Sequence, residues 1–156
     1  MIHPAYIAGF FDGEGCVNIT VRGKIRQVRL RLMIVNTHLE LLKILQAQYG
    51  GGLQKLTRQE NWKQAWQLTI HSKDDQKRFI EDILPYSILK LPQLYLALEF
   101  LEFMDLPKTV RCTFEHKPVP GMPSRIIAKR REDTMKKELE FKARLNAMNR
   151  RGISPN

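Results

Sequence analysis

Residues 6–15, with the sequence YIAGFFDGEG, constrain the fold more than any other stretch of the chain. The apolar run predicts a helix, and its small residues Ala8 and Gly9 predict one face that another backbone can approach closely. Helices with bulky contact residues pack about 8–10 Å apart, and small residues permit less. Glycine accepts the conformations that end a helix, so Gly13 and Gly15 predict that this helix stops there.

Two acidic residues, Asp12 and Glu14, fall at the predicted end of this helix. A helix C-terminus carries partial negative charge, which disfavours carboxylates unless a positive charge neutralises them. A divalent cation would do so, because carboxylate and backbone carbonyl oxygens are the hard ligands that magnesium prefers. The alternative is that both acids are solvated turn residues.

Residues 16–22 and 26–35 alternate between apolar and polar side chains, which predicts a β-hairpin with one face inward. The expected outward set carries no acid: Asn18, Thr20, Arg22, Gln27, Arg29, Arg31 and Met33. A two-stranded ribbon fits the DNA major groove, where Arg binds guanine and Asn or Gln binds adenine. We therefore predict a DNA-binding face, with an ordinary basic solvent face as the alternative.

A second hairpin is expected after a helix that begins near Asn36 and stops at the glycines 50–52. Alternation over residues 62–71 predicts further outward positions at Ala65, Gln67 and Thr69. The strand before it is too short to settle its parity. We assign Lys55 and Thr57 to the DNA-facing set, with Gln54 and Arg58 as the alternative.

Two more helices are expected over residues 73–84 and 88–104, followed by a proline-rich segment and a long basic helix over residues 124–149. The prediction is an α+β fold with a core over residues 1–105. Residues 106–156 are expected to form a connector and a C-terminal helix that pack on the same domain.

The net charge is +10, with 26 Lys and Arg residues against 16 Asp and Glu residues, and it indicates a polyanionic partner. A membrane surface is the competing polyanion, but no segment is long and apolar enough to span a bilayer, and no signal peptide is recognisable. Neither the two cysteines nor the four histidines have a metal-binding spacing, which excludes a zinc finger. Reduced cysteines predict an intracellular protein.

Residues 7–15 resemble the motif of the LAGLIDADG homing endonucleases, and the order of predicted elements agrees over about residues 3–104. The resemblance implies an αββαββα fold with a saddle-shaped antiparallel sheet that binds the major groove. With one motif in the chain, it also implies a homodimer, joined through motif helices, that cuts double-stranded DNA at a long pseudo-palindromic site. The expected interface residues are Tyr6, Ala8, Gly9, Phe10 and Asp12.

The resemblance also assigns the chemistry. Glu14 matches the family's metal-binding carboxylate, and Gly13 matches the residue whose carbonyl oxygen binds the same Mg²⁺. Lys90 matches a basic residue near the scissile phosphate, and Asn36 stands where a relative has a solvent-ordering glutamine. Asp12 is expected to support the helix ends at the interface. No small-molecule cofactor is expected.

Two other functions remain open. The chain could bind nucleic acid without cutting it, as an RNA maturase for intron splicing or as a transcription regulator, although a pure binder has no need of Glu14. A basic ribosome-associated or structural RNA-binding protein would leave Ala8, Gly9 and the acidic turn unexplained. Family members come from introns or other mobile elements, so we expect an organelle, either chloroplast or mitochondrion, or a prokaryotic cytoplasm.

Overall fold

A computed structural model describes residues 1–22, 27–57, 62–106 and 124–149, with the side chains at positions 22, 27 and 124–133 outside the description. The elements confirm the predicted order. They are α1 (Pro4–Glu14), β1 (Gly15–Arg22), β2 (Gln27–Asn36), α2 (Leu39–Tyr49), β3 (Gly52–Lys55), β4 (Trp66–Ile70), α3 (Lys73–Ile83), the short 3-10 helix η1 (Leu84–Tyr86), α4 (Leu91–Asp105) and α6 (Ser124–Asn149).

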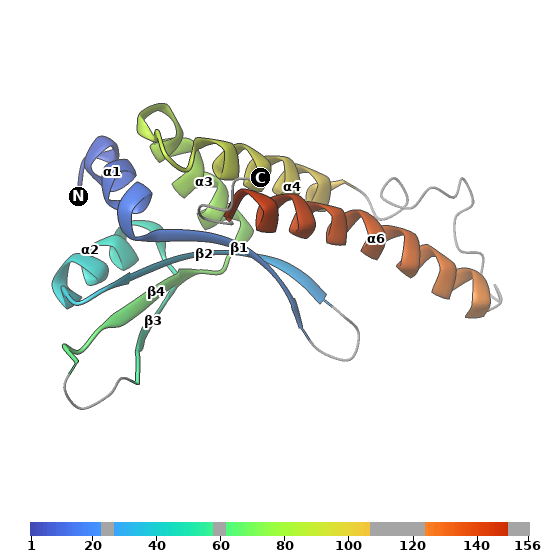
Figure 1. Cartoon of the computed structure of the whole chain (residues 1–156), viewed down its shortest axis with the longest axis horizontal. Helices are drawn as coiled ribbons and strands as arrows, with labels where there is room; N and C mark the ends of the chain where they lie inside the picture. The colour runs from blue at the N-terminus through green and yellow to red at the C-terminus, as the bar shows by residue number, and fades with distance from the viewer. Residues whose placement is uncertain (23–26, 58–61, 107–123, 150–156) are drawn as a thin grey trace, which may run out of the picture.

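The four strands form one antiparallel sheet in the order β1-β2-β4-β3. Figure 1 shows the sheet as an arch, with α1, α3, α4 and α6 on one side and the ends of both hairpins directed away from them. Residues opposite one another in an antiparallel pair share a face. Asn18 lies opposite Arg31, and Thr20 lies opposite Arg29, so the predicted polar positions of β1 and β2 share one face.

The other face of the sheet packs against the helices and forms the core. Val17 and Ile19 of β1 and Leu30 and Leu32 of β2 are each less than 5% exposed, as the alternation predicts. They join apolar residues of α1, α2, α3 and α4 in one cluster. The polar face is therefore left on the side away from the helices, where a ligand can reach it. None of the helices in the described residues combines the length and apolarity needed to cross a membrane.

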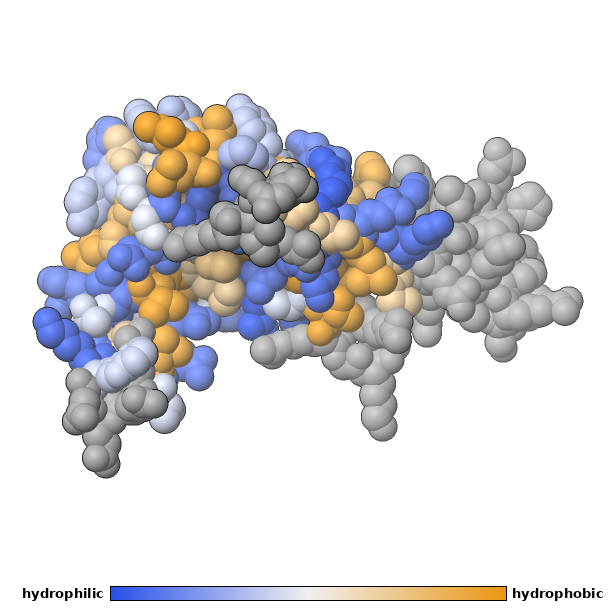
Figure 2. All heavy atoms as spheres, in the orientation of Figure 1, coloured by the Kyte–Doolittle hydropathy of each residue, from blue (hydrophilic) through white to orange (hydrophobic). Residues whose placement is uncertain are grey.

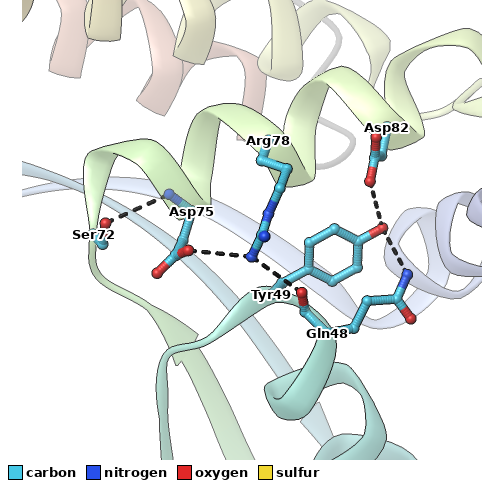
Figure 3. Close-up of polar contacts among 6 residues, drawn as sticks. All are labelled: Gln48, Tyr49, Ser72, Asp75, Arg78 and Asp82. Carbon is cyan, nitrogen blue, oxygen red and sulfur yellow. Dashed lines mark hydrogen bonds and ion pairs between the residues drawn. The ribbon is translucent and has the colours of Figure 1, made fainter. Parts of the chain in front are cut away.

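A polar network joins α2 to α3 (Figure 3), and it extends to the segment ahead of α1. The hydroxyl of the buried Tyr49 donates to Asp82 Oδ2 at 3.0 Å and accepts from Gln48 Nε2 at 3.2 Å. Burial and the Asp82 carboxylate raise the pKa of Tyr49 to about 12, so it stays a donor at neutral pH. Arg78 donates to the Gln48 carbonyl at 3.0 Å. The Gln48 side chain also pairs with both backbone groups of Ile2, which holds the chain just before α1 begins.

The C-terminal half of α6 packs against α4 and β1. Leu145 is 1% exposed, and the Phe141 ring stands edge-on to an aromatic ring of α4 at 5.5 Å. Arg144 makes two 2.9 Å hydrogen bonds to the Glu99 carboxylate of α4. Asn149 donates from Nδ2 to a backbone carbonyl of β1 at 2.9 Å. These contacts place the end of α6 beside β1, whereas the proline-rich connector lies outside the described residues.

Candidate functional site

The motif helix α1 runs directly into β1, and a glycine makes this possible. The helix begins with His3 as its cap and ends at Glu14, after which the Gly15 N–H donates to the Phe11 carbonyl. A Cβ on Gly15 would lie 2.3 Å from the Phe11 ring, so no larger residue fits. This close approach leaves Gly13 and Glu14 exposed at the junction of helix and sheet.

Asp12 has a structural task inside its own chain. Its buried carboxylate accepts hydrogen bonds from Ser87 Oγ at 2.5 Å and from the N–H groups of Ile88, Leu89 and Lys90 at 2.7, 3.0 and 3.1 Å. Burial by itself raises the pKa of Asp12, but these four hydrogen bonds outweigh it and hold the pKa below its usual range. The carboxylate therefore joins the end of α1 to the start of α4.

Lys90 reaches the end of the motif helix. Its Nζ donates to the backbone carbonyl of Asp12. The ammonium thus lies at the negative end of the helix dipole. The carbonyl that it contacts comes directly before Gly13 and Glu14 in the sequence. Burial raises the pKa of the nearby Cys16 thiol, and the Lys90 charge opposes that shift. The structure therefore gathers Lys90, Gly13 and Glu14 at the point where α1 meets the sheet.

The donor groups at this junction fit a divalent cation. The last carbonyls of a helix have no partner within the helix, and here the carbonyl of Gly13 is one of them. Apart from its chain neighbours and the nearby backbone of α1, no atom lies within 4 Å of the place where a Cβ of Gly13 would stand, and Glu14 is exposed. No group of three or more His, Cys, Asp or Glu residues forms a metal cluster in the described parts of the chain. Completing a six-oxygen shell for Mg²⁺ would thus need water, phosphate oxygens or a second copy.

Asn36 has a structural contact in its own chain, and its predicted solvent-ordering role stays a prediction. It has the parity of the core-facing residues of β2 and lies opposite Trp66 of β4. Its Oδ1 accepts from the N–H of His38 at 2.8 Å, and His38 in turn caps α2. The amide therefore shapes the turn between β2 and α2, and within the described residues no hydrogen bond joins it to Glu14.

The exposed face of α1 differs from the predicted seam in two residues. Ala8 is 0% exposed and packs in the core of its own chain, and Asp12 is held by the segment before α4, so neither side chain is free to contact a second copy. Tyr6 and Gly9 are exposed, and the Tyr6 ring stacks on Phe10 at 6.4 Å. Tyr6, Gly9 and Phe10 therefore remain as the available part of the predicted seam.

Two exposed apolar side chains follow η1. Ile88 and Leu89 are 80% and 71% exposed although their backbone N–H groups are tied to Asp12. Figure 2 shows apolar surface over this segment between η1 and α4. We refer to Tyr6, Gly9, Phe10, Ile88 and Leu89 as the apolar face. The last two were missed because a short linker gives no periodicity from which exposure could be judged.

The polar face of the sheet carries most of the predicted DNA-facing residues. Arg29 is exposed. Five other members are partly exposed: Asn18, Thr20, Arg31, Met33 and Gln67. The side chains of Arg22 and Gln27 lie outside the description. Thr69 is on this face but only 5% exposed.

Three predicted members of the polar face are corrected. Ala65 is 0% exposed and precedes β4, so the alternation that begins at Trp66 does not include it. In β3 the register pairs Gln54 with Gln67, which puts Gln54 on the polar face and Lys55 on the other. Thr57 lies beyond the end of β3. The alternative parity of the short strand was therefore the right one, and Arg58 lies outside the described residues.

Two further residues on the polar face were not predicted. Cys16 lies opposite Met33, and Val35 lies opposite Gln67. Both continue the alternation of residues already assigned to that face, so extending the pattern by one step at each strand end would have found them. Val35 adds an apolar side chain suited to contact with a thymine methyl group.

A family model described as a LAGLIDADG-like domain matches residues 2–84, more than half of the chain. Among curated protein sequences, none matches. Among solved structures, the homing endonuclease I-CvuI in complex with a DNA target in the presence of magnesium, not cleaved, aligns with 98% of this chain and 85% of its own, at 19% identity and a TM-score of 0.66. The archaeal intron-encoded homing endonuclease I-Vdi141I, complexed with DNA, aligns with 98% of this chain and 87% of its own, at 14% identity and a TM-score of 0.68. I-SmaMI bound to cleaved DNA aligns with 99% of this chain but 46% of its own, at 20% identity and a TM-score of 0.63.

Proposed function

The chain belongs to the LAGLIDADG family of homing endonucleases, and from this premise we propose that it is a site-specific, magnesium-dependent endonuclease that cuts double-stranded DNA as a homodimer. The observation that carries the proposal is the placement of an exposed carboxylate, Glu14, and an ammonium, Lys90, at the end of the motif helix beside the polar face. A protein that only bound DNA would have no use for a carboxylate facing the phosphates.

In this proposal, the Glu14 carboxylate and the Gly13 carbonyl hold the metal ion. Bound Mg²⁺ would activate a water molecule and stabilise the leaving oxygen. The Lys90 ammonium supplies a positive charge for the phosphate as negative charge develops on it. Asp12 keeps this charge in place by tying the segment that carries Lys90 to α1. Asp12 is therefore a positioning residue, separate from the metal ligands.

The polar face supports DNA as the substrate. Arg29 and Arg31 lie opposite Thr20 and Asn18, so arginines and small polar groups share one concave surface without an acid among the described side chains on it. Arginine pairs with guanine in two hydrogen bonds, and Asn pairs with adenine. The charge of +10 attracts the phosphate backbone.

The apolar face supports a second copy as the partner. Ile88 and Leu89 are too exposed and too apolar for a surface that meets only water, and Tyr6 adds an aromatic ring at 57% exposure. This chain aligns over nearly its whole length with less than half of I-SmaMI, which leaves room in that protein for a second unit of the same size. A dimer of this chain would supply two copies of Glu14, one for each DNA strand, and a pseudo-palindromic site would match its symmetry.

The test is cleavage of a randomised duplex library with Mg²⁺, followed by sequencing of the cut ends. The wild type should yield one long, roughly palindromic site. Glu14→Gln should lower cleavage of that site by at least about a hundredfold, because a metal ion contributes several kcal/mol of charge stabilisation. Binding to the same site should be retained, since the substitution keeps the size of an exposed side chain.

Glu81→Gln is the matched control, because Glu81 is also an exposed helical acid but lies on α3. It should cut like the wild type. Cleavage by Glu14→Gln at the wild-type rate would contradict the metal assignment. Site-specific binding by the wild type without any cleavage in Mg²⁺ would instead identify the chain as a nucleic-acid-binding relative.

A further inference from the structure

Gln67 lies at the centre of the polar face with its amide held by neighbours. It stands in β4, opposite Val35 of β2 and Gln54 of β3. Its Nε2 donates to Thr69 Oγ1 at 2.9 Å and to Met33 Sδ at 3.5 Å. The residue is partly exposed, so a ligand on the polar face can reach it.

The identity of the two acceptors determines which way the amide points. A methionine sulfur accepts hydrogen bonds but has no hydrogen to donate, so of the two amide atoms only the nitrogen can hydrogen-bond to Met33. An amide nitrogen carries two hydrogens, and here one goes to Met33 and the other to Thr69. In the described parts of the chain no group donates a hydrogen bond to Gln67 Oε1. This oxygen is also not one of the buried atoms without a partner, so it keeps access to solvent.

This arrangement changes what Gln67 can recognise. A glutamine with a free amide reads adenine by two bonds, donating to N7 and accepting from the N6 amino group. With both hydrogens already used, Gln67 retains only its acceptor. The donors that bases present in the major groove are the N6 amino group of adenine and the N4 amino group of cytosine, whereas guanine O6 and thymine O4 are acceptors and would be repelled.

We propose that Gln67 reads DNA as a hydrogen-bond acceptor only, and therefore accepts adenine or cytosine and rejects guanine and thymine at one position of each half-site. This inference rests on the proposed DNA recognition by the polar face. It adds which hydrogen-bonding group Gln67 offers to one base pair. It also names Met33 and Thr69 as the residues that orient the Gln67 amide.

Neighbouring strands hold the two acceptors in place. Met33 and Thr69 are opposite partners in the pairing of β2 with β4, and Thr69 also lies opposite Gly52 of β3, which has no side chain to displace it. Thr69 is 5% exposed. The amide must break two hydrogen bonds before it can turn, so the acceptor is presented to DNA already oriented.

The test uses binding selection without Mg²⁺, so that it does not depend on cleavage. Duplexes randomised across the site are selected with the wild type and with Gln67→Ala, and the position at which their base preferences differ is the one that Gln67 reads. At that position the wild type should accept adenine and cytosine within about threefold of each other, and should disfavour guanine and thymine by about tenfold or more.

The double variant Met33→Leu/Thr69→Val supplies the decisive comparison. It removes both acceptors while keeping the side chains similar in size, and so frees the amide to pair with adenine through two bonds. The preference at the Gln67 position should then shift toward adenine over cytosine by about tenfold. Gln54→Ala serves as the control, because Gln54 lies opposite Gln67 on the same face, and this variant should leave the Gln67 position unchanged.

Selection of adenine alone by the wild type, or of guanine or thymine, would overturn the inference. So would a selected site at which Gln67→Ala changes no position, or a double variant that keeps the wild-type preference. In these cases the protein still selects DNA, and the proposed function stands. A wild type that selects no sequence at all would overturn the proposed function, and this inference with it.

Discussion

At the scale of single residues, the Asp12 carboxylate determines the geometry of the site more than any other group. It accepts four hydrogen bonds from residues 87–90 and so holds the segment that carries Lys90. Asp12→Ala should lower the free energy of unfolding by on the order of 3 kcal/mol, because one hydroxyl and three N–H groups lose a charged acceptor. Urea unfolding measures this loss. A difference below about 0.5 kcal/mol would mean that water replaces the carboxylate without cost.

The same carboxylate predicts a pH dependence. Its folded-state pKa lies below the ordinary value of 3.8, so its stabilising contribution is fully present above that value and is lost as the pH falls through the folded-state pKa. The difference in unfolding free energy between the wild type and Asp12→Ala should therefore be constant from about pH 5 to about pH 7, where the carboxyl group is ionised in both the folded and the unfolded chain. The difference should shrink below about pH 4. A difference that stays constant to the lowest pH would contradict the assigned hydrogen bonds.

The motif singled out Glu14, which is exposed in the structure, and the family pattern singled out Lys90, whose ammonium reaches the Asp12 carbonyl at the end of α1. The catalytic roles of both residues stay predictions. The partners of Asp12 were beyond prediction, since they are more than 70 residues away in the sequence. The prediction that Ala8 lies at the dimer interface was wrong, because a small residue fits equally well against another molecule or inside its own core. Only the helix orientation decides between these, and Phe11 and Ile7 turn that face inward.

At the scale of secondary-structure elements, α6 is held on β1 and α4 by burial more than by charge. Leu145 is 1% exposed, whereas Arg144 and Glu99 form an ion pair with both side chains about half exposed. Leu145→Ala should lower the free energy of unfolding by about 2–5 kcal/mol, and Arg144→Ala by less than about 1 kcal/mol. Thermal or urea unfolding of the two variants side by side checks the ranking. An equal or larger effect of Arg144→Ala would mean that the ion pair holds this helix.

Periodicity predicted the long elements more accurately than the short ones. The eight residues of β1 and ten of β2 alternate long enough to assign both faces, and α6 has the predicted bounds. The four residues of β3 contain too few alternations to choose between Lys55 and Gln54, and only pairing with β4 settles the choice. Ala65 was misplaced for a related reason, because the start of a strand depends on its partner's hydrogen bonds and not on its own sequence.

At the scale of the whole molecule, the two exposed surfaces lie on different elements and have different partners in the proposed function. The polar face is built from strands and suits DNA, while the apolar face is built from α1 and the segment after η1 and suits a second copy. The end of α1 connects the two surfaces, because the helix ends at Glu14 and the first strand of the sheet begins at Gly15. Assembly and cleavage should therefore be coupled: weakening the proposed dimer should reduce cleavage at low protein concentration more than at high concentration.

Gly9 allows dimerisation to be tested separately from folding. It is exposed in α1, and a Cβ there would meet no atom within 4 Å beyond its chain neighbours and the nearby backbone of α1. Gly9→Leu should keep or raise the free energy of unfolding of one chain, by up to about 1 kcal/mol, because leucine favours helices more than glycine does. If the motif helices of two copies pack across this position, the same leucine would force them apart and weaken the dimer by at least about tenfold, since overpacking costs about 1–3 kcal/mol.

Sedimentation across a range of concentrations measures the dimer, with Ala47→Leu on the exposed side of α2 as the control for added apolar surface. A dimer of unchanged affinity in Gly9→Leu would place the interface away from α1, whereas loss of the dimer in both variants would point to a general effect of leucine on the surface.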